Sequence, residues 1–211
     1  MITPEDLAEL KNAYDKDYAD LPFCDWWKVE HLYKYARQES CVKTCEIGVF
    51  HGKSFLALAY AAKHNKKDGL AIGIDPWETD AAMQVLPDAL KSINKEVAEY
   101  DFEDIYQCVI SKLDKYDLSK HCKILRAKSQ DVVHTDPDIS DIDLLHIDGN
   151  HGEEAVMNDF KNYFEKVKPG GIVWFDDYHP IWTTIIPTVE YAKERCTLLE
   201  ETHNQAIFRK E

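Results

Sequence analysis

Short apolar runs alternate with helical patterns along this chain, and this alternation constrains the fold more than any other feature. The runs are four to eight residues long and are typical of buried strands. Strands are expected at residues 41–48, 70–75, 122–127, 142–147 and 172–175. Helices are expected between them at residues 54–63, 153–167 and 185–195. The alternation predicts an α/β fold in which a doubly wound, mostly parallel sheet carries helices on both faces.

The remaining segments complete one expected domain that spans all 211 residues. Residues 1–40 show helical spacing and are interpreted as a helical N-terminal extension. Residues 78–116 are interpreted as a mostly helical insertion after the second strand. Pro169-Gly170-Gly171 is expected to end the helix before it, as a glycine cap does. Residues 197–200 and 205–209 are expected to form a closing hairpin around His203-Asn204.

The charge balance excludes several classes of partner. A formal net charge of −14 repels polyanions, so neither nucleic acid nor an anionic membrane is expected as a partner.

None of the six cysteines forms a C-x-x-C pair, and the polar N-terminus does not resemble a signal peptide. The longest clean apolar run, residues 55–62, is too short to span a bilayer. These features favour a cytoplasmic protein.

The loop after the first strand reads Glu-Ile-Gly-Val-Phe-His-Gly-Lys-Ser, from Glu46 to Ser54. Its end resembles a phosphate-binding P-loop, but such a loop needs four residues between its glycines, and only three separate Gly48 from Gly52. A dinucleotide fingerprint fails as well, because Phe50 stands where it needs a glycine. Lys53 is expected on the surface at the start of a helix that Ser54 caps.

The pattern that remains, an acid followed by two glycines, suits a cationic ligand. Glycine allows a tight turn and a close approach of the backbone to a ligand. S-adenosylmethionine carries a sulfonium and an ammonium group, which Glu46 would attract. Asp75 ends the second strand, where such folds place an acid on the ribose hydroxyls, or it is simply a turn residue. Trp77 either stacks on the ligand or covers the core, and Ser129-Gln130 offers polar groups for an adenine edge.

Together these motifs resemble the class I S-adenosylmethionine-dependent methyltransferases, from about residue 41 to the end of the chain. The resemblance also includes Asp148 and the segment Lys168-Pro169-Gly170-Gly171. It implies a seven-stranded sheet in which the last hairpin makes one strand antiparallel. It further implies a cofactor site made of Glu46, Gly48, Phe50, Gly52, Ser54, Asp75, Pro76, Trp77, Ser129, Gln130 and Asp148.

Three carboxylates follow adjacent strands of the expected sheet. Asp148 comes after the fourth strand, and Asp176 and Asp177 come after the fifth. Three crowded anions repel unless protons or a cation offset their charge. All-oxygen ligation selects a hard cation, with Mg²⁺ first and Mn²⁺ or Ca²⁺ behind. The alternative is that Asp148 caps a turn while Asp176 and Asp177 are merely solvated.

The spacing Asp148-x-x-His151, followed by Asp176-Asp177, resembles the metal-dependent O-methyltransferases that act on sugars of macrolide antibiotics. The wider group also resembles the cephalosporin-hydroxylase-like proteins. The resemblance implies Asp148, Asp176 and Asp177 as metal ligands, and His151 and Asp148 as catalytic residues. His151 would be the base, with His179 as its rival. His146 lies inside a strand and is expected to be a satisfied core residue.

The leading hypothesis is therefore Mg²⁺-dependent O-methylation of a small-molecule or saccharide acceptor, with S-adenosylmethionine as the methyl donor. A second hypothesis keeps the methyl donor without a metal and methylates a nitrogen or a hydroxyl. A third is a nucleotide-binding module in which Gly52-Lys53-Ser54 is a degenerate P-loop. The N-terminal helices and the 78–116 insertion are expected to line the acceptor pocket. A homo-oligomer is also possible.

Overall fold

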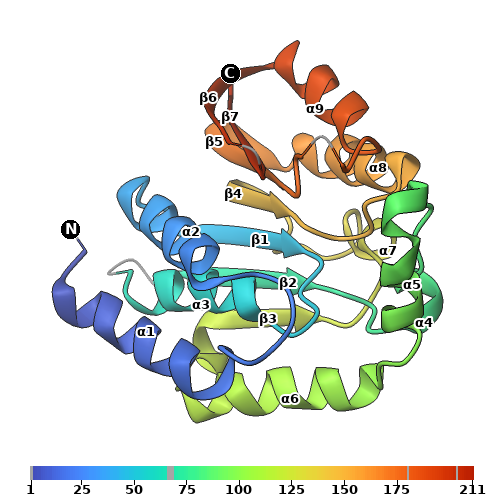
Figure 1. Ribbon diagram of the computed structural model, residues 1–211. Coiled ribbons are helices and arrows are strands. Elements are labelled where there is room, and N and C mark those ends of the chain that lie inside the picture. The colour runs from blue at the N-terminus through green and yellow to red at the C-terminus, as the bar shows by residue number, and fades with distance from the viewer. Residues whose placement is uncertain (1, 66–68, 180, 203) are drawn as a thin grey trace.

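The computed structural model describes residues 2–65, 69–179, 181–202 and 204–211. Its centre is a seven-stranded sheet with the order β3-β2-β1-β4-β5-β7-β6 (Figure 1). The sheet confirms the predicted fold class. The strands are β1 Lys43–Ile47, β2 Leu70–Ile74, β3 Cys122–Leu125, β4 Ile142–Ile147, β5 Val167–Asp176, β6 Cys196–Glu201 and β7 Gln205–Lys210.

The strand directions place the loops of interest at one edge. Strands β1 to β5 run parallel to one another, whereas β7 pairs antiparallel with both β5 and β6. This is the closing hairpin that the sequence predicts, although His203 of its turn lies outside the described residues. Since β1 lies between β2 and β4, and β5 follows β4, the loops after these strands share the carboxyl-terminal edge of the sheet.

Helices cover both faces of the sheet. One apolar core contains side chains of α1, α2, α3 and α6 against one face, and the other contains side chains of α8 and α9. Figure 1 shows this layering, with α1 and α6 far from α8 and α9. The α-helices are α1 Pro4–Asp17, α2 Trp26–Gln38, α3 Lys53–Lys63, α4 Thr79–Ala82, α5 Lys91–Val97, α6 Phe102–Lys115, α7 Ser129–Val132, α8 Glu153–Phe164 and α9 Ile186–Lys193. Short 3₁₀ helices occupy Asp88–Leu90 and Ser119–His121.

Two predicted boundaries are wrong. The helix expected at 153–167 ends at Phe164, and Pro169-Gly170-Gly171 lies inside the range of β5 instead of ending that helix. Gly170 has a φ of +79°, which suits glycine, and the β4–β5 register shifts there. The glycine pair therefore allows an irregular start to a strand. The 78–116 insertion is also less regular than predicted, because α4, a 3₁₀ turn, α5 and α6 are separate.

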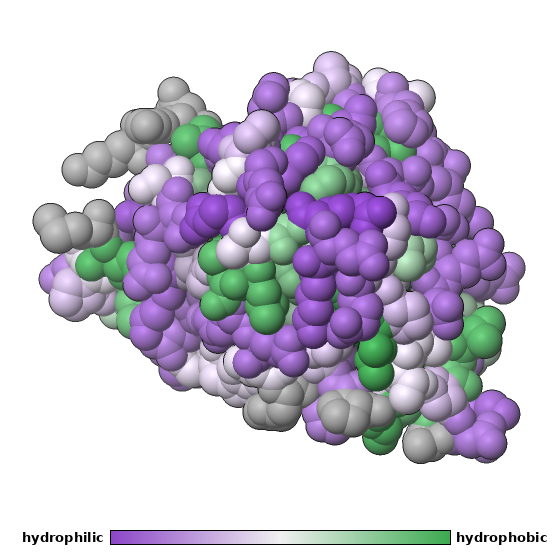
Figure 2. Space-filling view, turned by 90° about the horizontal axis from the view of Figure 1, so that it is seen from above, coloured by the Kyte–Doolittle hydropathy of each residue, from purple (hydrophilic) through white to green (hydrophobic). Residues whose placement is uncertain are grey.

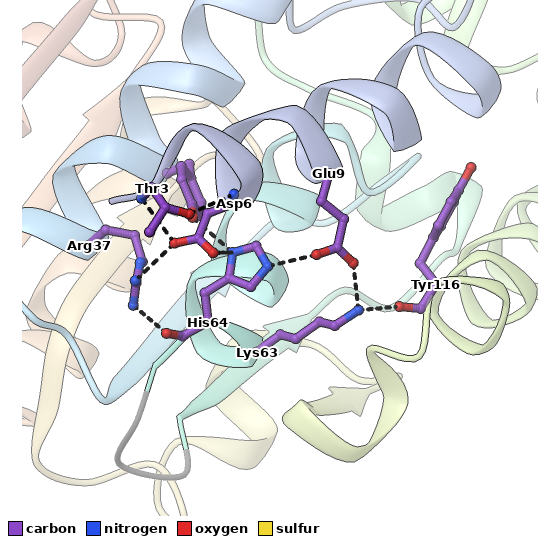
Figure 3. A network of polar contacts seen from close by, with 8 residues as sticks. Thr3, Asp6, Glu9, Arg37, Lys63, His64 and Tyr116 are labelled. Carbon is purple, nitrogen blue, oxygen red and sulfur yellow. Dashed lines mark hydrogen bonds and ion pairs between the residues drawn. The ribbon is translucent and has the colours of Figure 1, made fainter. Parts of the chain in front are cut away.

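The N-terminal helix α1 is fastened to α2 and α3 by a polar network (Figure 3). Asp6 accepts hydrogen bonds from the backbone N–H of Thr3 and from Arg37 of α2. Glu9 lies 2.8 Å from Lys63 Nζ and 3.0 Å from His64 Nε2, both at the end of α3. Burial raises the pKa of Glu9, but Lys63 and His64 together outweigh it and hold the pKa below its usual range. The extension is thus an integrated part of the fold.

Acid is expected to weaken the docking of α1 through Glu9. Because its folded-state pKa is lowered, Glu9 adds stability above its ordinary pKa of 4.5, and this stability is lost as the pH falls through the lowered value. The gain is below about 1 kcal/mol, since Glu9 is partly exposed. Thermal melts of wild type and Glu9→Gln should therefore differ at pH 6.5 and converge near pH 3. Glu5→Gln controls for the loss of one charge, and a difference that persists in acid would contradict this account.

The surface gives two further observations. The face in Figure 2, seen from the side on which β6, β7 and α9 lie in Figure 1, is mostly hydrophilic with smaller apolar patches. Leu198 and Leu199 of the edge strand β6 are 41% and 38% exposed. Among the described residues, no helix combines the length and apolar character that crossing a membrane requires. Formation of a homo-oligomer stays a prediction.

Candidate active site

The loop after β1 packs directly against the loop after β4. Gly48 has a φ of +89°, and a Cβ on it would lie 2.2 Å from the carbonyl oxygen of Asp148. Gly52 also has a positive φ, of +78°, but a Cβ there would meet only side chains, the nearest at 3.5 Å. Gly48 is thus required by contact between two protein loops, and Gly52 by the backbone turn into α3.

Asp75 holds the same loop from the end of β2. Its Oδ2 accepts hydrogen bonds from the N–H groups of Val49 and Phe50 at 3.0 and 2.9 Å, and its Oδ1 accepts one from Trp77. Burial raises the pKa of Asp75, and the backbone donors oppose that rise. Trp77 is 1% exposed, and its indole N–H donates to the carbonyl of Phe50. Of the two roles expected for Trp77, this geometry matches core packing beneath the loop.

Glu46 lies near the end of β1, beside His146 and Asp148. It is fully buried, and its Oε1 lies 2.7 Å from Nδ1 of His146 in β4. Burial raises the pKa of Glu46, while His146 and the nearby Ser54 hydroxyl lower it. His146 is 3% exposed, as expected for a satisfied core histidine. The structure therefore groups Glu46 with His146 and Asp148, and its Oε2 is buried without a hydrogen-bond partner among the described residues.

Lys53 is not the surface residue that the sequence predicts. Its side chain is 4% exposed, its ammonium donates to the carbonyl of Leu21 at 2.7 Å, and it lies over the ring of Tyr14. The helix also begins one residue earlier than expected, with Gly52 as the cap and Ser54 in the first turn. Within the Gly-Lys-Ser sequence, Lys53 thus binds the segment after α1.

The segment after β3 forms the short helix α7. The Ser129 hydroxyl donates to Asp159, and its carbonyl accepts a hydrogen bond from Tyr163 at 2.9 Å, so both of these groups are engaged with α8. Gln130 is exposed. The remaining predicted cofactor residues, Phe50 and Pro76, are half-buried in the two loops that Asp75 joins.

The polar cluster after β4 and β5 is compact. Nε2 of His151 lies 3.2 Å from Asp177 Oδ2 and 3.7 Å from Asp148 Oδ1. One ligand atom from each of these three residues lies within 4.8 Å of the others, a spacing that suits a metal ion. The ring of Trp182 packs on His151 with centroids 4.6 Å apart. The structure thus brings together Asp148, His151 and Asp177 at the edge predicted from sequence.

Asp176 is directed elsewhere, toward a lysine that sequence reasoning missed. Lys28 of α2 places its ammonium 2.8 Å from Asp176 Oδ2 and 3.2 Å from Asp177 Oδ1. The second oxygen of Asp176 is buried without a hydrogen-bond partner among the described residues. The sequence does contain a signal, because Lys28 precedes the buried Leu32 by four residues on the same face of α2. A lysine at such a position requires an anion.

The pKa values of Asp148 and Asp177 shift in opposite directions. Burial raises the pKa of Asp148 well above its usual range, and the neighbouring Asp176 raises it further. Burial acts in the same direction on Asp177, but His151 and Lys28 outweigh it and hold its pKa well below its usual range. The ammonium of Lys28 stays protonated, because the two acids overcome the effect of burial and raise its pKa. The site therefore has an excess of negative charge that a cation would offset.

His179, the rival base, lies on the loop after β5. Its Nδ1 accepts a hydrogen bond from the N–H of Ile181 at 3.2 Å. His151 contacts both Asp148 and Asp177 within 3.7 Å. The geometry thus groups His151 with the acids.

Solved structures share this fold across nearly the whole chain. The O-methyltransferase TomG from Streptomyces achromogenes, solved in complex with SAM, superposes with a TM-score of 0.65 at 16% identity, covering 99% of this chain and 91% of TomG. An O-methyltransferase from Bacillus cereus, in complex with SAH, superposes with a TM-score of 0.67 at 12% identity, covering 97% and 91%. At these identities, the likeness establishes the class I methyltransferase fold.

Sequence comparisons reach the same family. An uncharacterised protein of Acanthamoeba polyphaga mimivirus is 29% identical over 133 residues, which are 63% of this chain. The aligned region spans only 50% of that curated relative, and 12% of another from Sinorhizobium fredii. A family model described as a methyltransferase domain matches residues 45–178, from β1 through the carboxylate cluster. Because that match covers more than half of the sequence, the chain belongs to the methyltransferase-domain family.

Proposed function

We propose that this protein is an S-adenosylmethionine-dependent O-methyltransferase that uses a divalent cation, Mg²⁺ first, to methylate a hydroxyl group of a small molecule or saccharide. The observation that carries the proposal is the convergence of Asp148, His151 and Asp177 beside the Gly48 loop. The family match and the two similar O-methyltransferases, one solved with SAM and one with SAH, support the choice of methyl donor.

The acids beside the Gly48 loop suit a cationic methyl donor. Asp75 accepts hydrogen bonds from backbone N–H groups of the loop, whereas Glu46 keeps Oε2 without a hydrogen-bond partner among the described residues. The backbone of Asp148 lies against Gly48, and its carboxylate lies 3.7 Å from His151 and has one oxygen within 4.8 Å of a Glu46 oxygen. We therefore assign Asp148 as the acid that attracts the ammonium group of the donor. The other proposed cofactor contacts are Glu46, Gly48, Phe50, Gly52, Ser54, Asp75, Pro76, Trp77, Ser129 and Gln130.

The residues present also fit a hard divalent cation. Asp148 Oδ1 and Asp177 Oδ2 both lie near Nε2 of His151, and Asp176, whose Oδ1 is unpartnered among the described residues, is the proposed third ligand. Carboxylate oxygens are the ligands that Mg²⁺ prefers. When bound there, the ion would lower the pKa of an acceptor hydroxyl and hold it in place.

The side chains of the chain itself would handle the proton. His151 would accept the hydroxyl proton at Nε2, and Asp177 Oδ2, 3.2 Å away, would stabilise the resulting imidazolium. The ring of Trp182 restricts the orientation of the imidazole. Holding the acceptor in line with the methyl group is then mainly a positioning problem.

The acceptor pocket would be lined by the 78–116 insertion and the N-terminal helices. Asn150 donates hydrogen bonds to the carbonyls of Ala81 and Met83, and the His151 N–H donates to Gln84. These bonds place the insertion against the cluster. Met83 is 40% exposed and Trp27, next to Lys28, is 43% exposed, so both offer apolar area to an acceptor ring. A sugar hydroxyl is the proposed acceptor group.

Titration calorimetry with S-adenosylhomocysteine tests the cofactor assignment. We expect one site per chain with a dissociation constant in the micromolar range or below, and no competition by ATP. The ammonium of Lys53 is bonded to the Leu21 carbonyl, which leaves a phosphate no free lysine in this loop. Absence of heat at high micromolar S-adenosylhomocysteine would sink the proposal. Thermal protection by ATP alone would favour a nucleotide-binding module.

A metal-independent methyltransferase is the second candidate, and Lys28 is the observation that favours it. Its ammonium already pairs with Asp176 and Asp177, so part of the charge that a metal would offset is offset by the protein. The two candidates differ in one measurement. If EDTA leaves methyl transfer unchanged, the metal is dispensable and His151 alone would activate the hydroxyl.

A further inference from the structure

Lys28 is a buried cation at the proposed metal site, contributed by a helix that precedes the matched family region. Its side chain is 12% exposed and contacts residues 148 and 149 positions later in the sequence. It takes one oxygen from each of the consecutive acids, Oδ2 of Asp176 and Oδ1 of Asp177. Two short contacts to two buried or half-buried carboxylates show that the position of the ammonium is specific.

The ammonium contacts only one of the two carboxylate oxygens of each acid. Asp177 Oδ2 joins the group made with Asp148 and His151, whereas Asp176 contributes no atom to that group. Asp176 is 4% exposed, and its Oδ1 has no hydrogen-bond partner among the residues that the structure describes. A buried carboxylate with an unused oxygen beside a ligand cluster is poised to take another partner. Lys28 thus holds Asp176 outside the cluster.

We propose that Lys28 is a built-in competitor of the divalent cation, so that the ammonium must leave Asp176 and Asp177 before the ion gains its full set of carboxylate ligands. This inference rests on the proposed function, because it concerns the metal of that same site. It predicts that Lys28 weakens metal binding. The affinity of the site is then set partly by α2, outside the segment that carries the ligands.

The sign and size of the effect follow from electrostatics. A single positive charge and a divalent ion about 5 Å apart repel strongly at an effective dielectric constant of about 20. Removing that charge from a site with three carboxylates favours the ion. Relaxation of the freed acids reduces the gain, and we expect at least about tenfold tighter binding. A merely structural lysine would instead weaken binding when removed, because the acids would lose their alignment.

The experiment is calorimetric titration of MnCl₂, and then MgCl₂, into the full chain saturated with S-adenosylhomocysteine. Lys28→Met removes the charge and keeps the length, and we expect it to bind Mn²⁺ at least about tenfold more tightly than wild type. Lys28→Arg keeps the charge and should stay within about threefold of wild type. Lys34→Met is the matched control on α2, since Lys34 pairs with Glu30 at the surface, and it should bind as wild type does. The gain in Tm on adding Mn²⁺ should also be largest for Lys28→Met.

Each outcome decides the proposal. Equal or weaker Mn²⁺ binding by Lys28→Met overturns it, and so does Lys28→Arg binding as tightly as Lys28→Met, because packing would then be the cause. If no variant binds Mn²⁺, both this inference and the metal assignment fail. The heat of S-adenosylhomocysteine binding, measured first, separates these failures from failure of the methyltransferase assignment itself.

Discussion

An Asp177→Asn variant is expected to lose about 10³-fold in kcat for methyl transfer while binding S-adenosylhomocysteine as wild type does. Asp177 serves the proposed reaction twice, as a metal ligand and as the partner of His151 at 3.2 Å. Lewis-acid stabilisation contributes several kcal/mol, and each 1.36 kcal/mol corresponds to a factor of ten. The measurement is the release of S-adenosylhomocysteine with a hydroxylated acceptor found by screening, at saturating Mg²⁺.

The chain offers a matched control for this change. Asp117 has the same left-handed backbone as Asp177, with φ values of 55° and 54°, but lies exposed after α6. Asn tolerates that backbone at both positions. Asp117→Asn should therefore leave kcat unchanged. An Asp177→Asn enzyme within threefold of wild type would show that this carboxylate takes no part in the reaction.

A Gly48→Ala substitution should lower the free energy of unfolding by about 3 kcal/mol. The left-handed backbone costs about 1–2 kcal/mol with a Cβ present, and forcing a methyl group into packed atoms costs about 1–3 kcal/mol more. The clash at Gly48 is with the backbone of Asp148 and Gly149, so the loops after β1 and β4 must move apart. Urea unfolding measures the change, and binding of S-adenosylhomocysteine should fall with it.

Gly170→Ala separates the two contributions. Gly170 has a φ of +79°, close to the +89° of Gly48, but nothing lies within 4 Å of its Cβ position. It should lose only the conformational part, about 1–2 kcal/mol. Equal destabilisation by the two substitutions would mean that contact between the loops contributes nothing to stability.

Much of the sheet could be predicted from the sequence, because a buried strand can be recognised from its own few residues. Strands β1, β2 and β4 are buried along almost their whole length, and their positions were predicted to within two residues. The acids of the site were also identifiable, since each stands where a strand ends. Pro169-Gly170-Gly171 misled the prediction because the same residues suit a helix end and a strand bulge.

The direction of individual side chains could not be predicted in this way. Asp75 stands at the expected strand end, but its oxygens face the backbone N–H groups of Val49 and Phe50. Lys53 follows a glycine in a polar-looking motif, but its partner is a carbonyl that comes from the distant segment after α1. Such contacts depend on how helices pack across a sheet face, and hydrophobic period alone does not record that.

Lys28 and Lys53 each have a partner on the other side of the residue at which the family match begins. The family match begins at residue 45. However, the ammonium of Lys28 and the carbonyl of Leu21, which contact the buried Asp176 and Lys53 inside the matched region, come from before it. A fragment starting at residue 45 would leave Asp176 and Asp177 without their ammonium and Lys53 without its carbonyl. We therefore expect the cooperative folding unit to be larger than the segment that the family model matches, because Lys28 balances the charge of Asp176 and Asp177.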